Sequence, residues 1–370
     1  MSEQMMGVIN LIQEPDELGS LTASRCLATV PFGGRYRMID FTLSNMVNSG
    51  ITKVGLFAHT KFRSLMDHVG SGKHWDLHHR QSGLFVLPPV AEDMSDLRKG
   101  DLFHFYMHRD YFARCHLEHV IICRSHMVCN MDLSAVLKQH LEKDADITLV
   151  CKRLDEEPAG LARRVQVDGN GRVIDIQEHF GRLETDIASM EMYVMKKELL
   201  LDLVETSLAR GQDDLIKDAI MSRLGSLNIQ AFFHEGYLGI VNTLPAYFKY
   251  NMELLQPSVW RELFFMPGRV YTKVKDEPPT SYLKGAQSVN SLIANGCEIE
   301  GTVIGSILFR GVKVGKGAVV RNSIIMQNGI VGPDSTLEHV ILDKEVKIEP
   351  GRDIRGVEAS PYLAVKRKVI

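Results

Sequence analysis

The stretch HVIICRSHMVCNMDLSAVLKQHLEKDADITLVC, residues 119–151, decides the class of fold. Its two ends, HVIIC (119–123) and ITLVC (147–151), are short aliphatic runs of the kind that form buried strands. Between them, DLSAVLKQHLEKD (132–144) repeats apolar residues at helical spacing. The predicted buried face of this helix consists of Leu133, Val136, Leu137 and Leu141. Strand, helix and strand in this order predict an α/β domain with a largely parallel sheet.

The same alternation extends from residue 7 to residue 255, with VGLFA (54–58) as a further strand, so we assign residues 1–255 to this domain. Ligands of such sheets bind beyond the carboxyl ends of the strands. The loops after Ile12, Ala58 and Cys123 are therefore the places where functional side chains are expected.

The texture of the sequence changes after the α/β domain. Residues 256–285 contain four prolines and no sustained period, which predicts a connector. Over residues 286–370, apolar residues then recur every six positions and glycines punctuate the runs. Such a period is typical of a left-handed parallel β-helix, whose coils stack around an apolar prism. The positions in register are Ile293 and Ile299, then Val314, Val320 and Met326, then Val331 and Leu337, with Val312, Ala318, Ile324 and Ile330 in parallel. An ordinary β-sandwich is the alternative, but it does not require this recurrence.

The balance of charge gives no sign of a nucleic acid or membrane partner. The 43 basic and 46 acidic residues give a net charge of -3, without a run of like charge. No stretch approaches the roughly 18 consecutive apolar residues that a membrane span needs, and the first residues, MSEQMMGV, lack the features of a signal peptide. A cytoplasmic location is therefore expected.

The six cysteines are scattered without a CxxC pair, which favours reduced thiols over disulfides. Cys123, His126 and Cys129 have a metal-like C-x2-H-x2-C spacing. No convincing fourth ligand follows, and Cys123 closes an apolar strand. We therefore prefer small buried side chains beside a loop histidine and predict no metal site.

The most distinctive motif is VPFGGRYRMIDFTLSNMVNSGITKVG (30–55), in which two glycines and two arginines precede a helix. Taken alone, it suits a phosphorylated small molecule. Together with HVGSGKHWDL (68–77), ASMEMYVM (188–195) and GYLGIVNTLPAYFKYNMELL (236–255), it makes the chain resemble the glucose-1-phosphate adenylyltransferases, or ADP-glucose pyrophosphorylases, over nearly its whole length. The resemblance implies a nucleotidyltransferase domain followed by a left-handed β-helix, and synthesis of ADP-glucose for bacterial glycogen.

The first departure from that family lies in the loop after the first strand, where its enzymes hold the nucleotide phosphates with G-G-x-G-T-R. The aligned residues here, 12–17, read IQEPDE. Pro15 has no amide hydrogen to donate, and Glu14, Asp16 and Glu17 place negative charge against a triphosphate. Like charges a few ångströms apart in a partly desolvated site cost on the order of several kcal/mol, so we expect this loop to repel ATP.

The second departure concerns magnesium. The family uses two aspartates to bind the Mg²⁺ that aligns the phosphates, one in G-D-H-I-Y and one in G-Y-W-x-D-V-G-T. These motifs read RSHMV (124–128) and GYLGIVNT (236–243) here, so Ser125 and Ile240 replace the carboxylates. A hydroxyl and a hydrocarbon cannot supply the anionic oxygens that Mg²⁺ prefers. No catalytic residue and no bound cofactor are therefore assigned to this chain.

Two further departures affect the sugar phosphate. The resemblance implies a sugar-phosphate site at Glu178, His179 and Ser189, in which His179 stands where the F-x-E-K-P motif of the family has lysine. In the family's R-A-K-P-A motif, the lysine becomes Leu27, whereas Arg25 is retained. Some affinity for a sugar phosphate is still expected.

Basic residues point to a second site. Arg35 and Arg37 resemble positions near which family members bind anionic effectors. We expect a phosphorylated small-molecule effector there, with Arg25, Arg310 or the basic segment VKRKV (365–369) as further contacts. The alternative is that these arginines pair with neighbouring acids such as Asp40.

Four departures that all affect one reaction argue for a single lost activity. The combination resembles the GlgD-type subunit, which pairs with a catalytic GlgC-type subunit. The resemblance implies a regulatory, non-catalytic chain in a hetero-oligomer of two and two subunits, with Mg²⁺ at the catalytic partner. Two other functions stay open: a slow adenylyltransferase that uses Asp101, Asp132 or Asp213, and a β-helix acyltransferase that uses His339.

Overall fold

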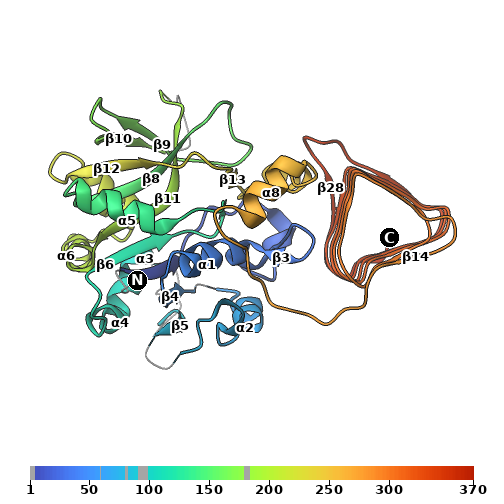
Figure 1. Cartoon of the computed structure of the whole chain (residues 1–370), viewed down its shortest axis with the longest axis horizontal. Coiled ribbons are helices and arrows are strands. Elements are labelled where there is room, and N and C mark those ends of the chain that lie inside the picture. Colours follow the sequence, from blue (N-terminus) through green and yellow to red (C-terminus); the bar gives the residue numbers. More distant parts are fainter. Residues whose placement is uncertain (1–4, 59, 80–81, 91–98, 179–183) are drawn as a thin grey trace.

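The computed structural model describes residues 5–58, 60–79, 82–90, 99–178 and 184–370. An α/β domain and a triangular prism of short strands lie side by side (Figure 1). Within the described ranges, no helix is both long enough and apolar enough to cross a membrane.

The α/β domain is built on one mixed sheet of nine described strands. Its order is β10-β9-β11-β6-β1-β4-β5, and β8 joins through β11 and carries β12. The strands are β1 (Met5–Asn10), β4 (Lys53–Phe57), β5 (Gly83–Leu87), β6 (His119–Cys123), β8 (Ile147–Arg153), β9 (Arg164–Val167), β10 (Val173–Gln177), β11 (Ile187–Lys196) and β12 (Ile229–Phe233). β6, β1, β4 and β5 run parallel, as the sequence predicts, whereas β11 is antiparallel to both β6 and β8.

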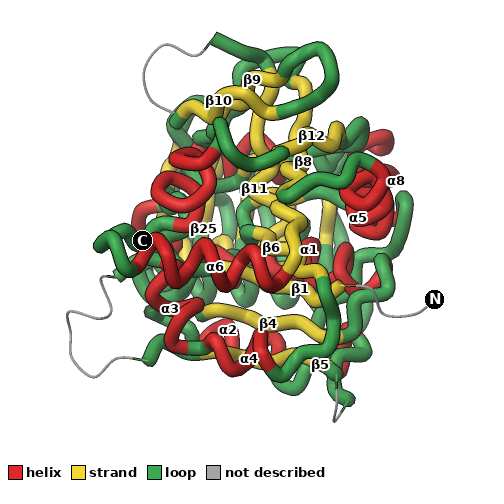
Figure 2. Tube along the Cα trace, turned by 90° about the vertical axis from the view of Figure 1, so that its left-hand side faces the viewer, coloured by secondary structure: helices red, strands yellow, loops and turns green. Residues whose placement is uncertain are grey.

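Helices cover both faces of this sheet. They are α1 (Met38–Asn48), α2 (Arg63–Val69), α3 (Asp101–Met107), α4 (Arg109–Ala113), α5 (Leu133–Glu142), α6 (Lys197–Leu208), α7 (Leu244–Glu253) and α8 (Pro257–Phe265). One apolar core gathers side chains from α1, α5, α7 and α8, and the other from α3, α4 and α6. Figure 2 looks onto α6, which lies in front of the sheet. The arrangement is the layered α/β fold that the alternation of strand and helix predicts.

Helix α5 differs from its prediction in one residue. Leu133, Val136 and Leu137 are buried as predicted, but Leu141 is 54% exposed and His140 is buried in its place. At 100° per residue, position 140 lies closer to the middle of the buried stripe than position 141 does. The imidazole of His140 contacts Thr148 Oγ1 at 2.9 Å and the ring of His119, so a polar side chain is satisfied there.

The prism is a parallel β-helix with three five-stranded faces. The first face consists of β14 (Ser281–Tyr282), β17 (Glu298–Ile299), β20 (Lys313–Val314), β23 (Ile330–Val331) and β26 (Lys347–Ile348). The second consists of β15 (Gln287–Val289), β18 (Thr302–Ile304), β21 (Val319–Arg321), β24 (Thr336–Glu338) and β27 (Asp353–Arg355). The third consists of β16 (Leu292–Ile293), β19 (Ile307–Leu308), β22 (Ile324–Ile325), β25 (Val340–Leu342) and β28 (Tyr362–Ala364).

Most of the residues with the predicted six-residue period are buried. Ile330 differs, because it is in register with Lys313 and Lys347 and thus points outward. Ile293 is only partly buried. The third face packs on the α/β domain, where Ile307, Ile324 and Ile341 join the core that also holds α1 and α7.

The segment predicted as a connector, residues 256–285, contains more structure than its prolines suggest. Pro257 occupies the first turn of α8, and Leu263 and Phe264 of that helix are buried in the α/β core. The β-helix starts with β14 at Ser281, before residue 286. The two prolines that follow α8 more distantly, Pro278 and Pro279, directly precede the first coil.

Candidate functional site

Three loop segments meet beyond the carboxyl ends of β1 and β6. The amide of Glu17 donates to the carbonyl of Asn242 at 2.7 Å. The strands β7 (Met127–Val128) and β13 (Gly239–Ile240) form an antiparallel pair, and the amide of Val241 donates to the carbonyl of His126 at 2.9 Å. The structure therefore brings together the segments that carry Glu17, Ser125 and Ile240, the positions of the first two departures from the family.

The carboxylate of Glu14 fills the space in front of Ser125. Its Oε1 accepts a hydrogen bond from the Ser125 amide at 2.5 Å, and its Oε2 accepts one from Ser125 Oγ at 2.9 Å. The Nδ1 atom of His126 lies 3.6 Å from the same Oε1, and the Glu14 side chain is only 5% exposed. A carboxylate in this place would repel the nucleotide phosphates that the resemblance implies at this loop.

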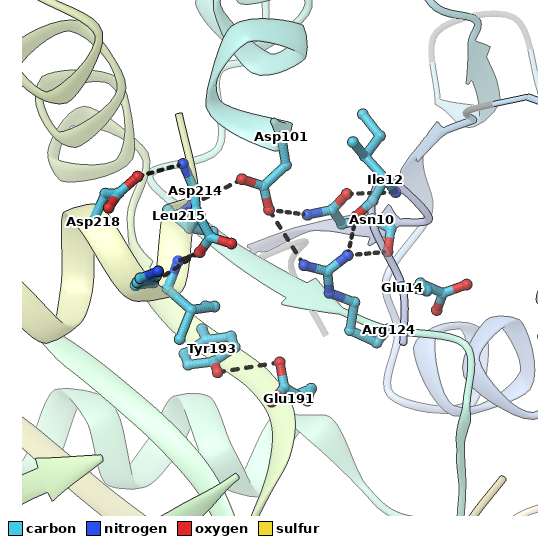
Figure 3. A network of polar contacts seen from close by, with 12 residues as sticks. Asn10, Ile12, Glu14, Asp101, Arg124, Glu191, Tyr193, Asp214, Leu215 and Asp218 are labelled. Carbon is cyan, nitrogen blue, oxygen red and sulfur yellow. Dashed lines mark hydrogen bonds and ion pairs between the residues drawn. The ribbon is translucent and has the colours of Figure 1, made fainter. Parts of the chain in front are cut away.

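Arg124, the residue before Ser125, is also committed within the chain (Figure 3). Its guanidinium donates to the carbonyl of Ile12 and contacts Asp101 Oδ2 at 3.3 Å. Asp101 further accepts from the Leu215 amide at 2.8 Å and from Asn10 Nδ2 at 2.7 Å. Burial raises the pKa of Asp101 to about 6, against the attraction of Arg124. This cation is therefore neutralised by the protein and does not face a ligand.

These residues do not fit a magnesium ion. Ser125 Oγ is bound to Glu14, and the side chain of Ile240 is 1% exposed in the apolar core. Across the described residues, no group of three or more His, Cys, Asp or Glu side chains has an arrangement that could hold a metal. The other acids considered for catalysis make structural hydrogen bonds. Asp132 caps α5 by accepting from the Ser134 amide, and Asp213 accepts from the Gly100 amide.

The two remaining sequence alternatives have structural roles as well. Cys123 and Cys129 are fully buried, and burial raises the pKa of both thiols, that of Cys129 to about 12. Both thiols thus behave as small buried side chains, as the sequence predicts. His339 packs its ring against Phe248 of α7, with 6.1 Å between the ring centroids, so it belongs to the contact between the two domains.

The predicted sugar-phosphate site contains an ion-pair network that the sequence does not reveal. Arg163 Nε contacts Glu178 Oε1 at 3.2 Å, and Arg163 Nη1 donates to both carboxylate oxygens of Glu191 at 3.0 and 2.9 Å. Ser189 Oγ accepts from the Glu191 amide at 3.1 Å. His179 lies outside the described residues. Glu178 and Ser189 are thus brought together, but through Arg163 and Glu191, which bind each other.

Glu191 is unusual in both backbone and charge. Its φ of +53° lies in the left-handed region, within β11 where the register with β8 shifts between Ser189 and Tyr193. Its side chain is 5% exposed. Burial opposes its ionisation, but Arg163, Arg124 and His126 together outweigh that effect and hold the pKa of Glu191 below the usual range. Such strain persists only where the surroundings stabilise it, and here the bidentate pair with Arg163 does so.

A second region, which we call the basic cavity, lies between the two domains and has a volume of about 500 Å³. Its cationic lining consists of Arg35, Arg37, Arg63, Lys273, Lys275, Arg310, Lys344 and Lys366. Two carboxylates, Asp67 and Glu345, also line it. The excess of positive charge suits an anionic ligand.

The glycine pair of the FGGR motif allows the two domains to approach each other here. Gly33 and Gly34 have φ values of +59° and +80° in the turn between β2 (Pro31–Phe32) and β3 (Tyr36–Arg37). A Cβ atom on Gly34 would lie 2.4 Å from a side-chain carbon of Leu292 in the β-helix. Only glycine fits this turn, and Arg35 follows it directly into the wall of the cavity.

The three arginines predicted as effector contacts differ in their surroundings. Arg35 lies over the ring of Tyr36, 5.3 Å from its centroid, and Arg37 donates to the carbonyl and hydroxyl of Ser64 at 2.9 and 3.0 Å. Both line the basic cavity. It is the main-chain amide of Arg37, and not its guanidinium, that bonds to Asp40.

Arg25 has a different role from Arg35 and Arg37. It is 4% exposed, and its Nη2 contacts both carboxylate oxygens of Asp343 in the β-helix at 2.8 and 2.6 Å. It therefore links the two domains behind the cavity wall and does not face the cavity. The adjacent Lys344 does line it, and burial, together with Arg37 and Arg25, lowers the pKa of Lys344 to about 7.

Comparison with known proteins places these features in a family context. The Nucleotidyl transferase model matches residues 16–257, and the GlmU-like, C-terminal hexapeptide model matches residues 279–360. The chain is 39% identical over 365 residues to the glycogen biosynthesis protein GlgD of Bacillus subtilis, covering 99% of this chain and 96% of that protein. It is 41% identical over 370 residues to GlgD of Geobacillus stearothermophilus, covering 100% and 98%. It is 35% identical over 311 residues to a glucose-1-phosphate adenylyltransferase of Thermotoga maritima, covering 82% and 73%.

Proposed function

We propose that this chain is a regulatory subunit without transfer activity of its own. It belongs to the nucleotidyl transferase family and is related along its whole length to GlgD-type glycogen biosynthesis proteins. The observation that carries this proposal is the contact between Glu14 and Ser125. It places a buried carboxylate, bound by two hydrogen bonds, where the reaction would need nucleotide phosphates and magnesium. Adenylyl transfer by this site would require that carboxylate to leave and two others to appear.

The regulated partner in this proposal is a catalytic, GlgC-type adenylyltransferase that binds the Mg²⁺, in an assembly of two and two subunits. The closed nucleotide site supports this division of roles, because an intact α/β domain is retained while its reactive positions are apolar or internally paired. The contribution of this chain is then to change the turnover of the partner through subunit contacts.

The regulatory ligand in this proposal is a phosphorylated small molecule in the basic cavity. Arg35 and Lys275 come from the α/β domain and its connection, whereas Arg310 and Lys344 come from the β-helix. An anion between them would contact both domains at once and would favour one relative placement of the two. Differential contacts of this kind are what a ligand needs to shift a conformational equilibrium.

Transfer activity tests the first part of the proposal. The purified chain, given Mg²⁺, ATP and glucose 1-phosphate, is expected to form no ADP-glucose, and its addition to a catalytic GlgC-type subunit is expected to change that subunit's kcat or KM. Glu191→Ala, which breaks the pair with Arg163, serves as a control for the closed sugar site and is also expected to be inactive. Robust ADP-glucose formation by the isolated chain would falsify the proposal.

Anion binding tests the second part. Hydrogen bonds to charged groups contribute about 1.5–3 kcal/mol each, so Arg310→Gln is expected to weaken binding of sulfate, used as the probe, by about tenfold or more. Arg355→Gln is a matched control, because Arg355 pairs with Asp353 on the exposed surface of the β-helix. Equal sulfate affinity of the two variants, measured by calorimetry, would count against the basic cavity as the ligand site.

A further inference from the structure

One corner of the β-helix carries a column of polar side chains into the basic cavity. The column consists of Arg310, Gln327, Lys344 and Lys366, which come from four successive coils and all line the cavity. The residue after each of them has a positive φ and turns the chain at the same place in its coil: Gly311, Asn328, Glu345 and Arg367. Main-chain hydrogen bonds of 2.9–3.0 Å join each coil of the column to the next. Because stacked strands lie about 4.8 Å apart, neighbouring members of the column are held close together.

Lys344 has no counter-charge in this column, although an acid stands on either side of it in the sequence. Asp343 accepts from Arg25 Nη2 with both carboxylate oxygens, at 2.8 and 2.6 Å. Glu345 Oε2 accepts from Arg367 Nε at 2.7 Å. Among the residues that the structure describes, none forms an ion pair or a hydrogen bond with Lys344 Nζ. Both neighbouring acids are thus committed to arginines, and the lysine side chain faces mainly cations.

These surroundings make the side chain of Lys344 a nucleophile near neutral pH. Burial lowers the pKa of its ammonium to about 7, together with Arg37 and Arg25, and Lys366 adds to the effect while Asp343 opposes it. A lysine that is partly removed from water and lies beside other cations is an activated amine. The same cations that disfavour the ammonium would stabilise an anion formed on its nitrogen.

We propose that Lys344 reacts reversibly with carbon dioxide and forms a carbamate, which makes the corner column a site of covalent modification. The electron pair of the uncharged Nζ attacks the carbon of CO₂ and forms an N–C bond, while one C=O electron pair moves onto oxygen. The nitrogen then releases one proton to water. The product is a carbamate with a single negative charge, and no other reactant is consumed.

The cavity supplies partners for each part of this group. The two carbamate oxygens require cationic donors, which Arg37 and Lys366 offer from the cavity wall. The remaining N–H requires an acceptor. The register of β22 with β25 places Gln327 opposite Lys344 in the adjacent coil, and Gln327 Oε1 is buried without a hydrogen-bond partner in the described part of the chain. An unsatisfied acceptor and a set of cations without counter-charge thus surround the same nitrogen.

The carbamate would compete with an anionic ligand for the cations of the basic cavity, so sulfate binding is expected to weaken as CO₂ rises. The modification itself needs neither a catalytic partner nor a phosphorylated effector. A modified Lys344 in a chain that leaves the partner's turnover unchanged would support the inference while the proposed function fails. An unmodified Lys344 in a chain that changes this turnover would do the reverse.

Chemical trapping tests the carbamate on the full chain. At about pH 8, where an amine with a pKa near 7 is mostly uncharged, isotopically labelled bicarbonate supplies the CO₂. A trialkyloxonium salt then converts carbamates to stable esters, and peptide mass spectrometry assigns their positions. Lys313 is the internal control, since its ammonium is bound to Glu298 Oε1 at 2.9 Å, and Lys344 is expected to carry about tenfold more label or a still larger excess. Lys366→Met, at an exposed position, is expected to lower the label on Lys344 several-fold.

Sulfate affinity gives a second readout, measured by calorimetry with and without CO₂. Lys344→Arg keeps the positive charge but forms no carbamate, because a guanidinium stays protonated. Bicarbonate, itself an anion, competes equally in both proteins, so only the carbamate predicts a larger effect of CO₂ on the wild-type chain. Circular dichroism spectra establish that the variants are folded. Label on Lys344 that does not exceed label on Lys313, label that persists undiminished in folded Lys366→Met, or an equal effect of CO₂ on the wild-type chain and Lys344→Arg would each overturn the inference.

Discussion

The loop at the end of β1 and the basic cavity both gather charged side chains, but they differ in what neutralises them. At the end of β1, Glu14 is bound to Ser125, and Arg124 to Asp101 and to main-chain carbonyls. In the basic cavity, Arg35, Lys275 and Arg310 take part in no ion pair with any described residue. The charges at the end of β1 are thus neutralised within the protein, whereas these three cations of the basic cavity are not.

This difference determines how much free energy each region would lose or gain when an anionic ligand enters. A ligand at the end of β1 would have to displace buried, charge-assisted hydrogen bonds and leave their partners unsatisfied, which costs about 1–3 kcal/mol for each group. An anionic ligand in the basic cavity would instead reduce the repulsion among its cations. Burial and neighbouring positive charge already lower the pKa values of Lys275, Arg310 and Lys344, which disfavours their charged forms. The distribution of charge therefore favours an anion in the basic cavity and opposes one at the end of β1.

The largest loss of stability is expected when a buried charge beside the cavity is left without its partner. Arg25→Met leaves Asp343 buried without its partner, and the loss of one member of a buried pair costs about 3–5 kcal/mol. The double variant Arg25→Met with Asp343→Leu removes both charges and is expected to recover most of that loss. Urea denaturation measures both free energies of unfolding. A single variant as stable as the wild-type chain would show that the pair does not hold the two domains together.

Much of the difference between the two regions could be predicted from the sequence, because it depends on strands and motifs that are contiguous in the sequence. The strand at residues 119–123 lies where its aliphatic run indicates, since a run of five apolar residues can be satisfied in a buried strand. The sequence directly shows that residues 12–17 contain no glycine and that Ser125 and Ile240 replace the carboxylates of the family. They predict the loss of phosphate and magnesium binding without any coordinates.

What could not be predicted depends on residues that are distant in the sequence. The sequence predicts that Glu14 repels ATP, but its bond to Ser125 joins residues 111 positions apart and needs the register of β1 against β6. The pair of Arg163 with Glu191 depends on a left-handed backbone at Glu191, which no local pattern predicts for a glutamate. The resemblance to the family groups Arg25 with Arg35 and Arg37 as effector contacts, whereas the fold directs Arg25 to Asp343, 318 positions away.

A smaller effect is expected when the carboxylate at the end of β1 is removed. Glu14→Ala leaves the buried amide and hydroxyl of Ser125 without acceptors, so the free energy of unfolding is expected to fall by about 1–3 kcal/mol. The isolated chain should still form no ADP-glucose, because Ser125 and Ile240 provide no ligand for Mg²⁺. Glu17→Ala is the matched control, since the Glu17 side chain is exposed and its removal should change stability by no more than about 0.5 kcal/mol. Equal stability losses in the two variants would show that the hydrogen bonds between Glu14 and Ser125 do not stabilise the end of β1.

The smallest expected effect is the pH dependence of anion binding, and it arises from Lys344. Burial and the nearby Arg37 and Arg25 lower the pKa of this ammonium to about 7, so much of it is neutral above that pH in the free protein. A bound dianion favours the charged form and raises that pKa, so binding above pH 7 takes up a proton and the affinity falls as pH rises. The slope can reach about tenfold, or 1.4 kcal/mol, per pH unit.

Sulfate is the suitable probe for this effect, because it stays a dianion from pH 7 to 9. Burial lowers the pKa of His68, the histidine in the cavity lining, so that ring is neutral across the same range and adds no slope. Calorimetry in two buffers with different heats of ionisation counts the protons that are taken up. Lys344→Met should bind sulfate more weakly at pH 7 but with a flat response up to pH 9, since it has no proton to gain. A slope that persists in Lys344→Met would assign the proton to another group and show that Lys344 is not one of the unneutralised cations that the cavity offers to a ligand.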